Sequence, residues 1–175
     1  MTPQAKHGLS VEPTHDEYAL QTYVSALRMY TLQEIGSGLR GVYESRVKPD
    51  FEQDKGRAPK DEHEVRRAMM ADPYCRTWSS MMRSAQEMIW DSVQGSLDRQ
   101  DDALNKRIKT PVKGAGSLRL NPEIKTPRYV AAVDIHCMPG NYHTEYTEDD
   151  AYQGALLDRG AFMYARGGRG PNHDS

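Results

Sequence analysis

The feature that most constrains the fold is an apolar pattern that follows Asp72 and continues to Leu97. Asp72 and Pro73 make a typical helix start, an acidic N-cap followed by a proline in the first turn. Apolar side chains then recur at helical spacing and form one broad stripe: Tyr74, Trp78, Met81, Met82, Ala85, Ile89, Trp90, Val93 and Leu97. Because a stripe this wide must be covered by other elements, we expect a long helix at the centre of the core, with a more polar continuation toward Ile108.

A second helical pattern precedes this one. Thr14 and Glu17 have the spacing of a capping box, and apolar residues follow at near-helical intervals. We expect Pro49 to end that helix, because proline disrupts a helix interior. The charged stretch 50–60 is then expected to be a loop, and residues 62–71 a short helix.

The C-terminal third carries a different pattern. Residues 129–135 are apolar and partly β-branched, which favours a buried strand. Thr147 and Asp150 have the spacing of another capping box, which predicts a short helix to about Leu157. Residues 161–165 suit a second short strand. The patterns together predict a mainly α fold (α+β), a helical bundle with a small β element near the C-terminus.

Length and composition place the chain among ordinary globular proteins. Its 175 residues suit a single core, and we expect a flexible leader over 1–13, a single helical domain over 14–166 and a flexible tail over 167–175. The 23 basic and 25 acidic residues nearly cancel, so no global field favours nucleic acid or a membrane surface. No apolar run could span a bilayer, and two cysteines in unlike contexts suit a reducing cytoplasm.

The glycines at positions 36, 38 and 41 match the spacing of a dinucleotide-binding loop. Such a loop needs a strand before it and a helix after it. The residues before Gly36 have a helical pattern, so the glycines are more typical of a helix that they weaken, or of helices that pack closely.

The densest group of chemically capable side chains lies over residues 134–145. Histidine can transfer protons near neutral pH, and a neighbouring carboxylate orients its ring. We therefore take Asp134, His136, His143 and Glu145 as the candidate catalytic residues. Two alternatives stay open. Asp134, His136 and His143 could bind a divalent metal, or the group could be a polar turn whose members satisfy one another.

Five further residues are candidates for substrate binding. Tyr142 and Arg159 would hold a polar group of the substrate. Trp78 and Trp90 could line an aromatic pocket, with Glu87 projecting beside them, although the helical spacing of the tryptophans is more typical of a core.

Several passages resemble a known family. They occur in the same order as in that family and cover about residues 68–171: Asp72-Pro73-Tyr74, Trp78, 84–90, 116–120, 127–145 and 154–164. The wording is similar to the N-terminal region of a bacterial group of class I SAM-dependent methyltransferases, ahead of the SAM-binding domain. The SAM-binding parts would follow this region, so we expect the chain not to be a complete methyltransferase and to use no cofactor.

Three functions follow from the site and the resemblance. The first is a small-molecule-binding domain that acts as a SAM-independent enzyme of small-metabolite biosynthesis, with the acid–base chemistry of a cyclase, lyase or isomerase. The second is a non-catalytic substrate-recognition or dimerisation partner of a separate methyltransferase, or a homodimer. The third is a metalloprotein that uses histidine and aspartate ligands.

Overall fold

The computed structural model describes residues 4–110, 116–117, 119, 121–132, 134–141, 144 and 150–166. The chain divides into two compact units. The terminal unit consists of Met1–Ser25 and Glu87–Ser175, and the middle unit of Ala26–Gln86. Helices α1 and α5 contribute residues to both units.

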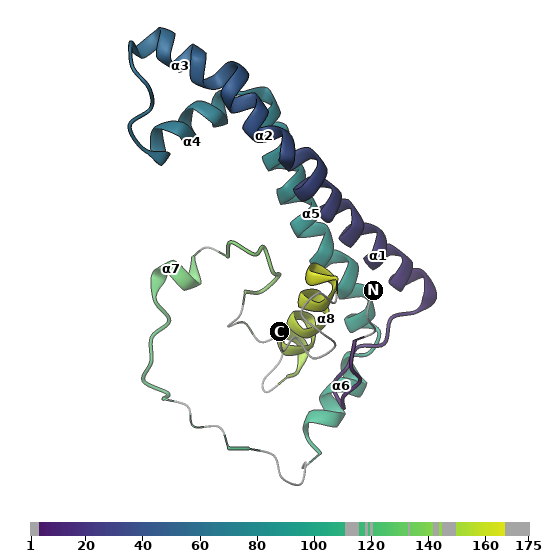
Figure 1. The fold of residues 1–175 in the computed structure, drawn as a ribbon. Coiled ribbons are helices and arrows are strands. Elements are labelled where there is room, and N and C mark those ends of the chain that lie inside the picture. Colours follow the sequence, from purple (N-terminus) through teal and green to yellow (C-terminus); the bar gives the residue numbers. More distant parts are fainter. Residues whose placement is uncertain are drawn as a thin grey trace. The chain divides into compact units, whose positions relative to one another are not determined.

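The described residues are mainly helical and include no strand (Figure 1), which confirms the prediction of a mainly α fold. The α-helices are α1 (His15–Tyr30), α2 (Gly36–Val42), α3 (Lys48–Lys55), α4 (Glu62–Ala71), α5 (Pro73–Asp98), α6 (Asp101–Ile108), α7 (Arg128–Ala131) and α8 (Tyr152–Ala165). Two π-helical turns, η1 (Thr31–Ile35) and η2 (Tyr43–Val47), join α1 to α2 and α2 to α3. No described helix combines the length and the apolar character that a membrane crossing requires.

The helix starts predicted at Thr14 and Asp72 are confirmed by hydrogen bonds, whereas Thr147, predicted to open the last helix, lies outside the described residues. The Glu17 backbone N–H donates to Thr14 Oγ1 at 3.3 Å, and the Thr14 N–H donates to Glu17 Oε2 at 2.7 Å, which is the reciprocal pattern of a capping box. At the start of α5, the carboxylate of Asp72 accepts from the Tyr74 N–H at 2.8 Å. Asp61 accepts from the Glu64 N–H and caps α4, which spans the expected residues.

The prediction that Pro49 ends a helix is wrong. Pro49 lies in the first turn of α3, directly after η2, and the helix continues to Lys55. A proline is tolerated there because its missing N–H is not needed in a first turn. The helix ends instead at Gly56, whose φ of 66° gives the left-handed cap that glycine adopts readily.

The small β element is not seen among the described residues. Tyr129 lies in the short helix α7 and Ile135 in a turn, where its side chain is 80% exposed. Residues 161–165 belong to α8, which therefore extends beyond the expected end at Leu157. A strand needs a paired neighbour for its backbone hydrogen bonds, and the described part of the chain offers none.

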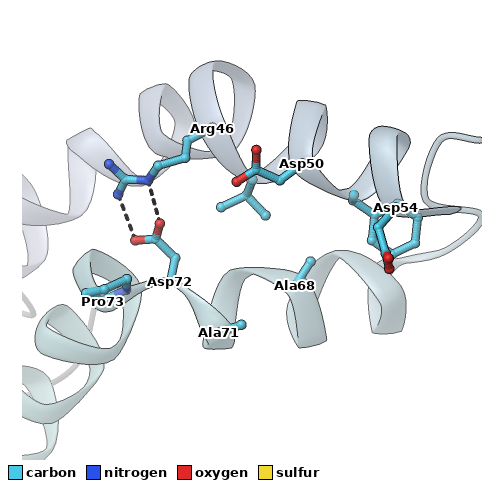
Figure 2. A pocket seen from close by; sticks show the side chains of 9 residues that line it. Arg46, Asp50, Asp54, Ala68, Ala71, Asp72 and Pro73 are labelled. Carbon is cyan, nitrogen blue, oxygen red and sulfur yellow. Dashed lines mark hydrogen bonds and ion pairs between the residues drawn. The ribbon is translucent and has the colours of Figure 1, made fainter. Parts of the chain in front are cut away.

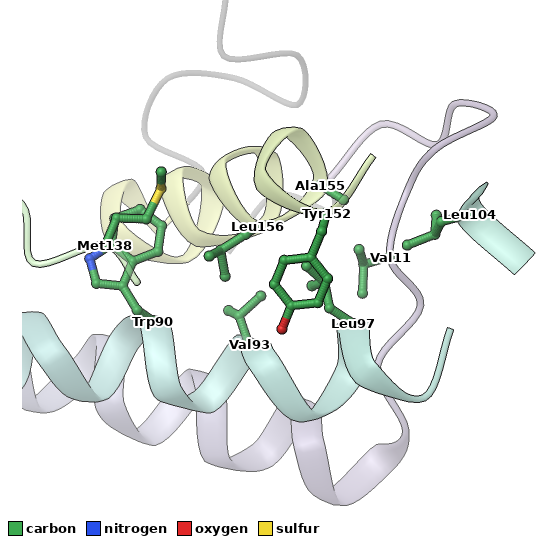
Figure 3. Packing of buried hydrophobic residues seen from close by; sticks show 9 residues of the cluster. All are labelled: Val11, Trp90, Val93, Leu97, Leu104, Met138, Tyr152, Ala155 and Leu156. Carbon is green, nitrogen blue, oxygen red and sulfur yellow. The ribbon is translucent and has the colours of Figure 1, made fainter. Parts of the chain in front are cut away.

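The core of the terminal unit lies between α5, α8 and the segment that precedes α1 (Figure 3). Its cluster of buried side chains consists of Val11, Trp90, Val93, Leu97, Leu104, Met138, Tyr152, Ala155 and Leu156. Val11 belongs to residues 1–13, where a flexible leader was expected, and it is 4% exposed. Gly160 of α8 lies against the ring of Trp90, which leaves no room for a side chain at that position.

In the middle unit, the glycine pattern serves helix packing. A Cβ atom at Gly36 would lie 3.2 Å from Trp78 Nε1, and one at Gly38 would clash with the hydroxyl of Tyr74. The Trp78 indole donates to the Thr31 carbonyl at 3.1 Å, and the Tyr74 hydroxyl donates to the Ile35 carbonyl at 2.7 Å. The glycines therefore allow aromatic residues of α5 to approach the backbone of η1 and α2, rather than forming a loop around a nucleotide.

Candidate functional site

The described part of the predicted catalytic cluster is a capped turn. Asp134 accepts from the backbone N–H of His136 at 2.8 Å and from that of Met138 at 2.6 Å. Each carboxylate oxygen accepts one of these bonds, so Asp134 holds the turn that inserts Met138 into the core. A side-chain acceptor that bonds to backbone N–H groups within a few residues commonly shapes such turns.

His136 is more exposed to solvent than Asp134. Its side chain is 51% exposed, and its Nδ1 lies 3.7 Å from Asp134 Oδ1. The neighbouring Cys137 has a φ of 58° and lies half-buried beside the core, with its Sγ 3.8 Å from the Ile135 carbonyl oxygen. His143, Glu145 and Tyr142 lie outside the described residues. The described residues therefore bring together Asp134 and His136 of the four candidates.

The metal alternative depends on the same positions. Within the described ranges, no three histidine, cysteine, aspartate or glutamate side chains lie close enough together to hold a metal ion. The set proposed from the sequence includes His143, which lies outside those ranges, so it stays a prediction.

The tryptophans occupy packed positions. Trp90 is 3% exposed, and its indole N–H donates to the His136 carbonyl at 2.6 Å. Trp78 is half-buried and bonded within the middle unit. Glu87 is exposed on α5. Neither tryptophan lines the pocket between α3 and α4 or the pocket beside Arg159.

Arg159 of α8, which the sequence suggested as a substrate-binding residue, is a charged group in an unusual setting. It is 4% exposed, and its hydrogen-bond partners among the described residues are neutral amides. Its Nε and Nη2 donate to Gln21 Oε1 at 2.9 and 2.7 Å, and its Nη1 donates to Gln4 Oε1 at 2.9 Å. Buried charges are usually paired with an opposite charge, and here no described carboxylate makes that contact.

The two glutamines connect Arg159 to carboxylates at a distance. The Gln4 amide nitrogen donates to Asp158 Oδ2 at 2.7 Å. The Gln21 amide nitrogen donates to Ser96 Oγ at 3.2 Å, and Ser96 donates in turn to a carboxylate, that of Glu17, at 2.9 Å. The guanidinium is thus held rigidly, and neutral groups separate it from the nearest negative charges along both hydrogen-bonded chains.

A pocket opens beside this arginine, with a volume of about 330 Å³. Its walls come from the segment before α1, from α1 and from α8, and include the lining residues Lys6, Val11, Pro13, Tyr18, Arg159 and Phe162. The guanidinium carbon lies 5.8 Å from the centre of the Tyr18 ring and 5.5 Å from that of Phe162. Such distances allow cation–π attraction, which fixes the orientation of the group further.

The electrostatics of the pocket are set by few groups. Burial lowers the pKa of the Arg159 guanidinium, and Tyr18 and Asp158 act in the opposite direction. An arginine stays charged in proteins all the same. At the rim, Lys6 pairs with Glu12 at 2.8 Å, and both side chains are exposed. Lys6 and Glu12 offset each other, so the lining keeps one net positive charge, on Arg159.

A second and larger hollow lies in the middle unit, between α3 and α4, with a volume of about 700 Å³ (Figure 2). Arg46 spans one end and bonds to Asp72 through Nε at 2.6 Å and Nη2 at 2.9 Å. This hydrogen-bonded pair lowers the pKa of the Asp72 carboxyl. Asp50 and Asp54 lie on the α3 side, opposite Ala68 and Ala71 of α4. Its one described arginine is already paired with a carboxylate, unlike Arg159.

No family model, curated protein or solved structure matches the chain.

Sequence reasoning missed the residues that make Arg159 unusual. Gln4 and Gln21 are polar residues with no motif around them, and Tyr18 carries no signal beyond its place on a helix. Their relation to Arg159 is a property of the fold, since Gln4 is 155 positions away from it along the chain.

Proposed function

We propose that this chain is a small-molecule-binding domain whose ligand is an anion held by Arg159. The observation that carries the proposal is a buried guanidinium that lines a pocket while its described partners are neutral amides. Small-molecule sites combine mostly apolar walls with a few fixed polar groups. The pocket beside Arg159 has apolar walls and a fixed polar group. Because the positive charge of Arg159 is not compensated by a described carboxylate in contact with it, the expected ligand is negatively charged.

Stabilisation of the fold does not by itself explain why an arginine is buried at position 159. A buried charge costs free energy to desolvate, and well-packed apolar residues often replace buried ionic groups at no loss of stability. Arg159 contributes three hydrogen bonds, but it requires Gln21 and Gln4 to be oriented toward it. An anion that entered the pocket would supply the charge compensation that the described residues do not.

The resemblance to the N-terminal region of SAM-dependent methyltransferases is part of the same proposal. Arg159 and Phe162 lie within the resembling passage 154–164. In that view the pocket is the substrate site of the domain. Acid–base chemistry without SAM is the enzymatic form of the proposal, and recognition of a substrate for a separate methyltransferase is the alternative form.

The proposal is tested by titrating the ¹⁵N-labelled chain with acetate, benzoate and phosphate, each at constant ionic strength, and following the backbone amide signals. We expect at least one anion to shift the signals of residues that line the pocket, such as Val11 and Tyr18. The Arg159→Met variant should lose the response, whereas Arg128→Met, which removes an exposed arginine of α7, should keep it. If no anion shifts these signals, or if the Arg159→Met variant responds like the unchanged chain, the proposal fails.

A further inference from the structure

We infer that the ligand of this pocket is a monocarboxylate attached to a flat apolar group, such as an aromatic ring. The inference rests on the proposed function and names the class of anion that Arg159 would hold. It follows from the donors, the charge and the walls of the pocket.

The donors favour a carboxylate. A guanidinium carries five N–H groups in one plane, and three of those of Arg159 donate to Gln21 and Gln4. The remaining two N–H groups, one on each terminal nitrogen, have no acceptor among the described residues. A planar pair of donors suits the planar pair of oxygens of a carboxylate.

The charge favours a monoanion. Arg159 is the one cation of the lining without a carboxylate in contact, because Lys6 is paired with Glu12. The carboxylate of Asp158 accepts a hydrogen bond from Gln4, which lines the pocket, and would repel a second negative charge. A phosphate monoester carries about 1.5 to 2 negative charges near neutral pH, more than the one net positive charge of the pocket offsets.

A phosphate would also find few backbone donors. Phosphates are commonly held by the free N–H groups at a helix N-terminus. The pocket borders the start of α1, but there the capping box of Thr14 and Glu17 already occupies two backbone N–H groups and adds a carboxylate.

The walls favour an apolar, flat body. Val11, Pro13 and Phe162 line the pocket together with Tyr18, which is 43% exposed. Aromatic rings attract one another in offset-stacked or edge-to-face arrangements. A volume of about 330 Å³ lies at the small end of ligand cavities, which suits a single-ring acid.

The experiment compares four probes by NMR titration: benzoate, benzamide, phenyl phosphate and acetate. Benzoate and benzamide differ in charge, benzoate and phenyl phosphate in the anionic group, and benzoate and acetate in the ring. We expect benzoate to bind at least about tenfold more tightly than each of the others and to shift the Nε–H signal of Arg159. Because that signal is read on the unchanged protein, the test does not depend on a variant that folds.

Variants then show which residue binds the carboxylate of benzoate and which residue contacts its ring. Arg159→Lys keeps the charge but loses the planar donors, and it should weaken benzoate at least about tenfold. Tyr18→Leu should weaken benzoate and leave acetate unchanged. Arg128→Lys is the matched control and should leave every affinity unchanged.

The outcomes separate the inference from the proposed function. If phenyl phosphate binds in the pocket at least as tightly as benzoate, the monocarboxylate class is overturned while anion binding stands. If acetate binds as tightly as benzoate, the inference that the ligand carries a flat apolar group is overturned. If none of the three anions shifts the Arg159 signal, the proposed function itself is overturned.

Discussion

Arg159 and Gln21 are joined by two hydrogen bonds to one oxygen, from Nε at 2.9 Å and from Nη2 at 2.7 Å, and both side chains are buried. The amide nitrogen of Gln21 is used as well, because it donates to the Ser92 carbonyl and to Ser96 Oγ, each at 3.2 Å. Gln21 therefore has one orientation in which all its bonds are made. That orientation presents its oxygen, and no negative charge, to the guanidinium.

The first prediction concerns this pair. Gln21→Met should lower the free energy of unfolding by about 3 kcal/mol, because it removes two hydrogen bonds from a buried cation. Arg159→Met should lower it by about 2 kcal/mol, because a buried amide oxygen is left unpaired. The double variant should lose at least about 1.5 kcal/mol less than the two singles together. Urea unfolding measures all four proteins, and strictly additive losses would show that the two side chains are not coupled.

A second prediction uses two glycines of α8. Gly160→Ala would place a methyl group against the ring of Trp90 and should destabilise the protein by about 1–3 kcal/mol. Gly154→Ala meets no atom within 4 Å and should stabilise the helix by up to about 1 kcal/mol. Thermal unfolding of the two variants should thus move in opposite directions. Equal shifts would mean that the contact between α8 and Trp90 is absent in solution.

The third prediction concerns acid. Hydrogen bonds from Arg99 are the largest cause that lowers the pKa of Glu17, from 4.5 to about 2, with smaller contributions from Thr14 and Ser96. Because the folded pKa is the lower one, the folded state binds fewer protons than the unfolded state between these values. The stabilisation is therefore complete above pH 4.5 and lost as the pH falls toward 2.

Glu17→Gln should show less of this acid dependence than the unchanged chain, because the titrating group is gone. Unfolding by urea at pH 7, 4 and 3 measures the effect. Glu34→Gln, at an exposed position, is the matched control and should keep the full dependence. Parallel pH profiles for the unchanged chain and the Glu17 variant would contradict the pairing of Glu17 with Arg99.

A fourth prediction concerns the turn at Asp134. Asp134→Ala removes the acceptor for two backbone N–H groups and should cost about 1–2 kcal/mol, because the turn that places Met138 in the core is weakened. Ile135→Ala, at the exposed position next to it, should change the stability by less than about 0.5 kcal/mol. Chemical unfolding measures the stability of both variants. If Asp134→Ala leaves the stability unchanged, the structural role of that carboxylate is contradicted and a catalytic role is favoured.

Helix positions could be predicted where a start signal and an apolar stripe coincide. Asp72 and Pro73 mark the start of α5, and Val93 and Leu97 of its stripe are fully buried. The buried face of α1 could not be predicted in the same way. Leu20 is 48% exposed and Gln21 1% exposed, since bonds to α5 and α8 stabilise the glutamine inside. The hydrogen-bond partners of a buried amide can be distant in the sequence, so no local sequence pattern predicts them.

The prediction of a strand at 129–135 was wrong for a related reason. Apolar and β-branched residues suit a sheet only where a neighbouring strand completes their hydrogen bonds. The composition around Tyr129 and Ile135 contains no information about such a neighbour. For the site, the sequence did suggest that Arg159 holds a polar group, but its neutral surroundings follow from Gln4 and Gln21 and could be seen only in three dimensions.

The 155 positions between Gln4 and Arg159 also set the order of events during synthesis. A ribosome delivers Gln4 before α1, and Arg159 only after α1 to α7 have been made. The pocket wall that contains Lys6 and Val11 is synthesised first, and the pocket is complete only when the wall that contains Arg159 and Phe162 has followed. A nascent chain that has not reached α8 therefore lacks the proposed site, and any stabilisation by the proposed ligand requires a chain that contains α8.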